Sequence, residues 1–338
     1  MLVGRMWERS EIESALERAR SGESRALALV GEPGIGKTAL LDYASEHAAG
    51  MQLLSARGVE SEARIPFASL LELLRPALPL TEADSPAYLP GLFQTAIGSV
   101  LDSPKITEKV RGGGGFGWHE HVHDVHEGCE RFFRPGYNAH LIAEWLPSLD
   151  GVVEKLERGA LVADVGCGHG ASTILMAKAF PNSTFMGSDY HDGSIETARQ
   201  RAQEAGVADR VSFQIAPAAS YGGSQYDLVT MFDCLHDMGD PVGAARHVSS
   251  TLKPDGTWMI VEPNAGDRVE DNLNPVGRAF YGFSTLLCTP ASLSQDVGLA
   301  LGAQAGQARI QDVVHAGGFT QFRRASETPF NLVYEARP

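Results

Sequence analysis

Apolar and polar positions follow two different patterns along the chain. Near the N-terminus, apolar residues recur at helical spacing over residues 8–20, and the apolar run at 25–30 predicts a strand. A helix is predicted from Ala39, a second strand at 51–56, and a buried helix at 69–76 that Pro76 ends. The first part of the chain therefore begins as helix, strand, loop and helix.

The second pattern is a regular alternation of short apolar runs with helical stretches. Residues 128–145 precede it and predict mostly helix, with a break at Pro135-Gly136. Strands separated by helical lengths imply right-handed crossovers and a parallel, doubly wound sheet, and the last two runs are close enough for an antiparallel hairpin at its edge. The predicted strands are 161–165, 184–188, 211–215, 226–232 and 257–261, with helical stretches between the first four and before the last, and the hairpin joins 319–324 to 330–336.

Proline and glycine mark the junction between the two patterns. Pro79, Pro86, Pro90 and Pro104 interrupt the helical spacing, and a glycine run follows at 112–115. We expect the junction between about Pro104 and Gly117. This division assigns residues 1–103 to an N-terminal segment, 104–148 to a linker and helical lid, and 149–338 to a C-terminal domain.

Composition narrows the class of protein. The 338 residues carry a formal net charge of -14, which argues against sequence-independent binding to nucleic acid or to an anionic membrane. The four cysteines have no C-x-x-C spacing, so neither a zinc knuckle nor a disulfide scaffold is predicted, and a reducing cytoplasm is expected. No stretch resembles a signal peptide or a membrane span.

The strongest chemical motif is Asp164-Val-Gly-Cys-Gly-His-Gly170, which lies directly between a predicted strand and a predicted helix. Glycine lets the backbone turn tightly and lets a ligand approach where a Cβ would clash. Asp189 ends the next strand, where an acid can accept both hydroxyls of a ribose. The spacing departs from G-x-G-x-x-G, so a dinucleotide is disfavoured. Packing glycines without a ligand are the weaker alternative.

These motifs resemble those of the class I S-adenosylmethionine-dependent methyltransferases, over about residues 117–338. The resemblance implies a Rossmann-like α/β fold and S-adenosylmethionine as the cofactor, with an unidentified small molecule as the methyl acceptor. It places the ribose on Asp189 and the adenine beside Tyr190 and after the third strand, at Ala216-Pro217. It assigns the cofactor loop to Asp164, Gly166, Cys167, Gly168 and Gly170.

Two further regions are expected at the same edge of the sheet. Residues 226–237 run from a strand into a loop that carries Asp233 and His236, which the resemblance places near the cofactor's methionine part and the acceptor. His236 is the candidate general base because imidazole titrates near neutral pH. Glu262 ends the following strand and is a candidate for orienting the substrate. Backbone hydrogen bonding by His236 and capping by Glu262 are the structural alternatives.

A histidine-rich stretch, Trp118-His-Glu-His-Val-His-Asp-Val-His126, precedes the predicted lid. Alternating histidines without a cysteine at a known spacing do not match a zinc site, so no metal is predicted. We expect residues 130–137 to form an aromatic lid over the cofactor through Phe132, Phe133 and Tyr137. The same three residues are equally compatible with an ordinary core.

The N-terminal segment contains a P-loop pattern, Gly31-Glu-Pro-Gly-Ile-Gly-Lys-Thr38, and resembles the start of the ATPase modules of large LuxR-type regulators. Backbone N–H groups at Gly31, Gly34 and Gly36 would cradle phosphates, Lys37 would reach the β and γ phosphates, and Thr38 would bind Mg²⁺. No apolar strand ending in an acid follows, and Asp102 is predicted in a helix. We therefore expect a truncated module that can bind ATP but does not hydrolyse it.

Three interpretations remain open at this point. The first is methyl transfer to a small molecule, the second is an ATP-binding regulatory protein whose methyltransferase fold only binds a ligand, and the third is a gene fusion whose N-terminal fragment is a passive remnant. Relatives often carry a winged-helix domain where this chain has the P-loop segment, so their dimerisation and any DNA-binding role are not carried over, and a homodimer stays an open alternative. An apolar acceptor pocket is indicated by Phe280, Tyr281, Phe283, Leu286 and Leu287.

Overall fold

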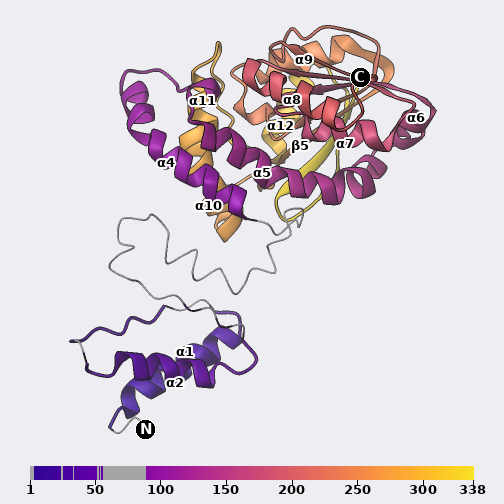
Figure 1. The fold of residues 1–338 in the computed structure, drawn as a ribbon. Helices are drawn as coiled ribbons and strands as arrows, with labels where there is room; N and C mark the ends of the chain where they lie inside the picture. Colours follow the sequence, from indigo (N-terminus) through magenta and orange to yellow (C-terminus); the bar gives the residue numbers. More distant parts are fainter. Residues whose placement is uncertain (1–3, 24–25, 33, 52, 54, 56–88) are drawn as a thin grey trace. The chain divides into compact units, whose positions relative to one another are not determined.

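A computed structural model of the chain describes residues 4–23, 26–32, 34–51, 53, 55 and 89–338. The chain divides into two compact units, Met1–Pro79 and Leu80–Pro338. The sequence places this junction later, between Pro104 and Gly117. The difference arises from α4 (Pro90–Arg111), a continuous helix that packs along α5 (His123–His140) in the second unit (Figure 1).

Glycines allow this close helix packing. A Cβ on Gly91 of α4 would lie 2.4 Å from the backbone nitrogen of Phe132, and one on Gly128 of α5 would lie 2.5 Å from the backbone nitrogen of Thr95. Both distances are shorter than van der Waals contact, so the two backbones approach as they do only because these side chains are absent. Residues 90–103 therefore pack as part of the C-terminal unit.

In the first unit the structure describes two helices, α1 (Met6–Arg20) and α2 (Lys37–His47), which confirm the predicted helices around the P-loop. Ile12, Leu40 and Tyr43 are the buried side chains between them. The predicted strand at 25–30 is wrong for its described residues, 26–30, which form no strand. In the described part of this unit no neighbouring strand pairs with the backbone of residues 26–30. The predicted helix at 69–76 and most of the predicted strand at 51–56 lie outside the described residues.

The second unit is built on a seven-stranded sheet in the order β3-β2-β1-β4-β5-β7-β6. The first five strands pair in parallel, and β7 pairs antiparallel with β5 and β6. This arrangement confirms the predicted doubly wound sheet with a C-terminal hairpin. The strands are β1 (Leu161–Val165), β2 (Thr184–Asp189), β3 (Val211–Ile215), β4 (Tyr226–Phe232), β5 (Leu252–Pro263), β6 (Gln321–Glu327) and β7 (Asn331–Arg337).

Helices cover both faces of the sheet and bury two separate apolar clusters. Val162 and Phe185 pack on one face, whereas Val229 and Trp258 pack on the other. The first face is covered by η4 (Leu141–Trp145), α6 (Val152–Arg158), α7 (Ala171–Ala179) and α8 (Asp192–Glu204), and the second by α9 (Pro241–Thr251) and α12 (Gly306–Ala316). Both faces of the sheet are therefore buried, which explains why the strand sequences are nearly continuous apolar runs.

Two local predictions are wrong. The helix break at Pro135-Gly136 does not occur, since α5 continues through Pro135, and burial of Pro135 and Tyr137 offsets the hydrogen bond that proline cannot donate. No helix connects β3 to β4, because residues 216–225 are short, contain Pro217 and two glycines, and form turns.

The remaining elements are short and lie mostly between β5 and β6. Among the described residues, no helix combines the length and the apolar character that crossing a membrane requires. The short elements are η3 (Trp118–Glu120), η5 (Leu146–Ser148), η6 (Leu235–Asp237), η7 (Val269–Asn272), α10 (Pro275–Phe283), η8 (Ser284–Cys288) and α11 (Thr289–Leu293).

Candidate active site

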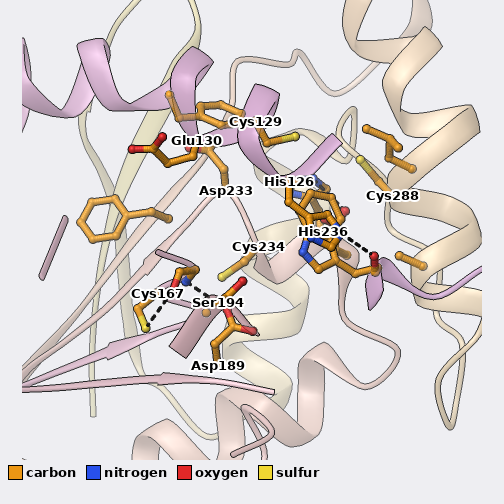
Figure 2. A pocket seen from close by; sticks show the side chains of 18 of the residues that line it. His126, Cys129, Glu130, Cys167, Asp189, Ser194, Asp233, Cys234, His236 and Cys288 are labelled. Carbon is orange, nitrogen blue, oxygen red and sulfur yellow. Dashed lines mark hydrogen bonds and ion pairs between the residues drawn. The ribbon is translucent and has the colours of Figure 1, made fainter. Parts of the chain in front are cut away.

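A cavity of about 490 Å³ opens at the carboxyl ends of β1, β2 and β4 (Figure 2). Open α/β sheets bind ligands at this edge, where the strand order reverses between β1 and β4. The wall is mainly apolar and includes Phe132, Phe133 and Tyr137 of the predicted lid. Phe280, Phe283 and Leu287, three of the five residues predicted to shape an acceptor pocket, also line the cavity.

The glycine loop forms the floor of this cavity. Gly166, Gly168 and Gly170 have φ values of 74°, 51° and 77°, the left-handed region that disfavours a side chain. A Cβ on Gly166 would also lie 2.6 Å from the Sγ of Cys234. Gly166 and Cys167 donate backbone hydrogen bonds to the Ser188 carbonyl, at 2.8 and 3.0 Å. The loop is thus fixed against the end of β2.

Asp189 ends β2 at the cavity wall, as the sequence predicts. Its Oδ2 accepts the N–H of Gly168 at 3.0 Å, and its Oδ1 accepts the N–H of His191 at 2.9 Å. Burial raises the pKa of Asp189, while these N–H groups oppose the rise. Each carboxylate oxygen has a second lone pair, so the group can still accept hydrogen bonds from a ligand.

The structure separates the predicted loop residues into two groups. Gly166, Cys167 and Gly168 line the cavity, whereas Asp164 and Gly170 do not. Asp164 is 1% exposed and accepts hydrogen bonds from Ser172, Thr173 and Thr230. This carboxylate therefore links the loop to α7 and β4, and its assignment to the cofactor loop stays a prediction. Tyr190 and Ala216 also line the cavity.

His236 and Glu262, which the sequence places separately, form one buried pair. The Nδ1 of His236 lies 2.6 Å from Oε2 of Glu262, and Oε1 of Glu262 accepts the Leu235 N–H at 3.1 Å. His236 lines the cavity, while Glu262 lies behind it. Glu262 therefore orients the imidazole rather than facing the cavity.

A second carboxylate faces the other nitrogen of His236. Oδ1 of Asp237 lies 3.1 Å from Nε2. Burial favours the neutral imidazole, but the charges of Asp237 and Glu262 outweigh it and raise the pKa of His236 well above its usual value. The sequence places His236, Asp237 and Glu262 at the same edge of the sheet but does not specify that both acids contact the imidazole.

Asp233 lies between the lid and the sheet edge. Its Oδ2 accepts the hydroxyl of Tyr137 at 3.0 Å, and its Oδ1 accepts the side-chain amide of Asn331 at 2.8 Å. Burial, aided by the charge of Glu262, raises the pKa of Asp233 to about 8. Asp233 also has a positive φ of 50°. This network ties α5 to β4 and β7, and Asn331 was not predicted because the hairpin carries no recognisable site motif.

One group of potential metal ligands occurs among the described residues. Ligand atoms of His236, Asp237 and Cys288 lie within 4.8 Å of one another. A metal binds the thiolate form of cysteine, but burial raises the pKa of Cys288 to about 12. With its thiol protonated at neutral pH, this group is a poor metal site.

The P-loop residues lie in the first unit. Gly34 and Gly36 have φ values of 83° and 93°, and Gly36 caps α2. Nζ of Lys37 donates to the carbonyls of Gly31 and Glu32, at 2.8 and 2.9 Å, and Thr38 is exposed. Asp102 lies in α4 as predicted and belongs to the second unit, where it accepts the N–H of Val122 and lies beside His121.

Two protein families match the chain. Residues 156–296 match a family described as a methyltransferase domain, and residues 1–163 match one described as an AAA ATPase domain. The first match contains the glycine loop, Asp189, His236 and Glu262. The second contains the P-loop and overlaps the start of the methyltransferase match.

Named relatives match a part of the chain. A ubiquinone biosynthesis O-methyltransferase from Bordetella avium (strain 197N) is 34% identical over 120 residues, covering 35% of this chain and 46% of the relative. The 27-O-demethylrifamycin SV methyltransferase of Amycolatopsis mediterranei (strain S699) is 35% identical over 140 residues, covering 39% and 51%. The chain thus spans about half the length of these relatives.

A solved structure supports the fold. An O-methyltransferase family protein from Burkholderia thailandensis superposes with a TM-score of 0.55 at 18% identity, covering 74% of this chain and 72% of the other. At that identity the likeness concerns the fold alone.

Proposed function

Since its C-terminal part is a class I S-adenosylmethionine-dependent methyltransferase domain, we propose that this protein transfers a methyl group from S-adenosylmethionine to a hydroxyl of a small molecule. One observation carries the proposal: the glycine loop, Asp189 and the His236–Glu262 pair meet at a single cavity. The O-methyltransferase relatives support an oxygen acceptor.

Two features of the cavity support cofactor binding. Gly166 and Gly168 place no Cβ at the cavity wall, and the free lone pairs of Asp189 suit two ribose hydroxyls. Tyr190 and Ala216 would border the adenine. Asp233 would act near the methionine part by holding Tyr137 over it.

The proposed reaction needs no covalent intermediate with the protein. When bound, S-adenosylmethionine supplies an activated methyl group whose sulfur leaves with the bonding electrons. His236 would take the acceptor's hydroxyl proton on Nε2, while Glu262 holds the ring through Nδ1. The apolar walls of the cavity would position the acceptor and exclude water.

The test is a transfer assay with methyl-labelled S-adenosylmethionine and a panel of small phenols and alcohols. We expect label to appear in at least one acceptor, with S-adenosylhomocysteine formed in equal amount. If the full chain binds the cofactor and transfers no label to any member of a broad panel, the regulatory alternative is favoured.

The pH dependence of the reaction gives a sharper prediction. The base must be neutral, and because Asp237 and Glu262 raise the pKa of His236, the rate should rise as pH increases through that raised pKa. The Asp237→Asn variant loses one of the two charges, so its rising limb should move to lower pH. Rates of methyl transfer measured between pH 6 and 10 check this shift, and Asp209→Asn, a change at an exposed surface carboxylate, is the control. If the rising limb of the pH–rate profile does not move in Asp237→Asn, His236 is not the base.

For the first unit we propose binding of ATP phosphates by the P-loop, without hydrolysis. The left-handed Gly34 and Gly36 and the match to an AAA ATPase domain support it. Lys37, which hydrogen-bonds carbonyls of its own loop, would exchange them for the β and γ phosphates, and Thr38 would bind Mg²⁺.

Calorimetry with ATP and Mg²⁺ measures this binding. The wild type should bind, Lys37→Ala should bind at least about 10-fold more weakly because one charge-assisted contact is lost, and Lys109→Ala in the second unit should match the wild type. Equal binding by Lys37→Ala would remove the P-loop from consideration.

A further inference from the structure

The histidine-rich segment, defined as residues 118–126, has no part in the methyl transfer described above. Its four histidines have different surroundings. His121 is buried against the carboxylate of Asp102, with Nδ1 at 3.2 Å from Oδ2, and the side chain of His123 is 81% exposed. His119 and His126, together with Trp118, line the cavity. His121 therefore anchors the segment and His123 points outward. Trp118, His119 and His126 form its inward wall, which lines the cavity.

The inward wall is an ordered aromatic stack. The ring of His126 stacks on Trp118, with centroids 5.1 Å apart and planes 13° apart. Nε2 of His126 lies 2.9 Å from the Trp118 carbonyl, so this nitrogen carries the hydrogen and donates it. The hydrogen bond and the stacking fix the ring in one orientation.

The stack reaches the residues beside Asp189. The ring of His126 meets that of His191 edge to face at 4.9 Å, and the N–H of His191 is a donor to Oδ1 of Asp189. One residue earlier, Tyr190 meets the ring of His119 at 6.2 Å. A chain of contacts thus leads from the histidine-rich segment to the carboxylate that we assign to the ribose.

The stack is uncharged. Burial, the largest influence, and the neighbouring His191 lower the pKa of His126 to about 4, so its ring is neutral at pH 7. A neutral aromatic wall can pack against a planar base.

We propose that Trp118 and His126 form a wall of the cofactor's nucleoside site and hold His191 and Asp189 in place for binding. This inference rests on the proposed function. It makes the two residues cofactor-positioning residues and gives the histidine-rich segment a role other than metal binding.

The test compares binding of S-adenosylhomocysteine to full-length variants by calorimetry. His126→Ala should weaken binding about 10-fold or more, within the range that alanine substitution gives for aromatic residues that stack on bases. His126→Phe keeps a ring in the stack and should recover most of the affinity. His123→Ala alters the outward histidine of the same segment and should bind like the wild type.

Fluorescence gives a second readout that general loss of structure would not mimic. Trp118 lines the cavity, whereas Trp145 and Trp258 are fully buried elsewhere. Addition of S-adenosylhomocysteine should change the emission of the wild type and of His123→Ala, and Trp118→Phe should lose most of that change while remaining folded. If His126→Ala binds as tightly as the wild type, or Trp118→Phe keeps the full signal, the wall is not formed by these residues. Failure of the wild type itself to bind would instead refute the proposed function.

Discussion

Replacement of His236 by glutamine is expected to slow methyl transfer about 10²-fold to 10⁴-fold, the contribution of a positioned general base. Glutamine fills similar space and can keep a hydrogen bond to Glu262, but it cannot take the acceptor's proton. Cofactor affinity should change little, because Nε2 faces Asp237 and the cavity rather than Asp189. The measurement is kcat for an acceptor found in the panel, together with the Kd of S-adenosylmethionine.

The matched control is His315→Gln, which changes an exposed histidine on α12. We expect its rate to equal that of the wild type. A His236→Gln enzyme with an unchanged rate over the whole pH range would mean that positioning alone drives the reaction and that the buried pair is structural.

Replacement of Asp189 by alanine is expected to weaken S-adenosylmethionine binding at least about 100-fold. Hydrogen bonds to a charged group contribute about 1.5–3 kcal/mol each, and the ribose offers two hydroxyls to this carboxylate. The variant also leaves the N–H groups of Gly168 and His191 without their acceptor, which loosens the glycine loop. Calorimetry gives the change in Kd, and thermal unfolding of the free variant shows how much of it comes from the loop.

Asp192→Ala serves as the control for this experiment. Asp192 is exposed at the start of α8 and hydrogen-bonds the adjacent N–H of Gly193. Its replacement should leave the Kd unchanged. Equal affinities for Asp189→Ala and Asp192→Ala would show that the ribose lies elsewhere.

The sequence predicts the sheet well because strands that are buried on both faces consist of continuous apolar runs. The runs 211–215 and 226–232 are the strands β3 and β4. Glycines at 166 and 168 mark the loop because glycine adopts those positive φ values with the least strain. Local chemistry of this kind is readable without knowledge of the tertiary structure.

Tertiary contacts account for the difference between the predicted junction and the division of the structure. Pro104 predicts a break, but one proline costs less than the contacts that α4 gains along α5, including the approach at Gly91. As a result Leu92 and Thr95, on the part of the chain assigned to the N-terminal segment, line the cavity. The spacing of residues in the sequence does not predict that packing.

The hydrogen-bond partners of charged residues in the site also come from distant parts of the sequence. Asp164 looks like a ligand-facing residue, yet three hydroxyls from α7 and β4 enclose it. Asn331 reaches Asp233 from the C-terminal hairpin, far along the chain. Such pairings depend on where strands meet across the sheet, which the local pattern does not specify.

The central claim is that S-adenosylmethionine binds across the glycine loop and Asp189. The most direct measurement is a crystal structure of the full chain with S-adenosylhomocysteine. We predict the ribose hydroxyls within hydrogen-bond distance of the Asp189 carboxylate and the sulfur on the His236 side of the cavity. A nucleoside bound at another place, or a cavity that stays without ligand at saturating concentration, would contradict the account.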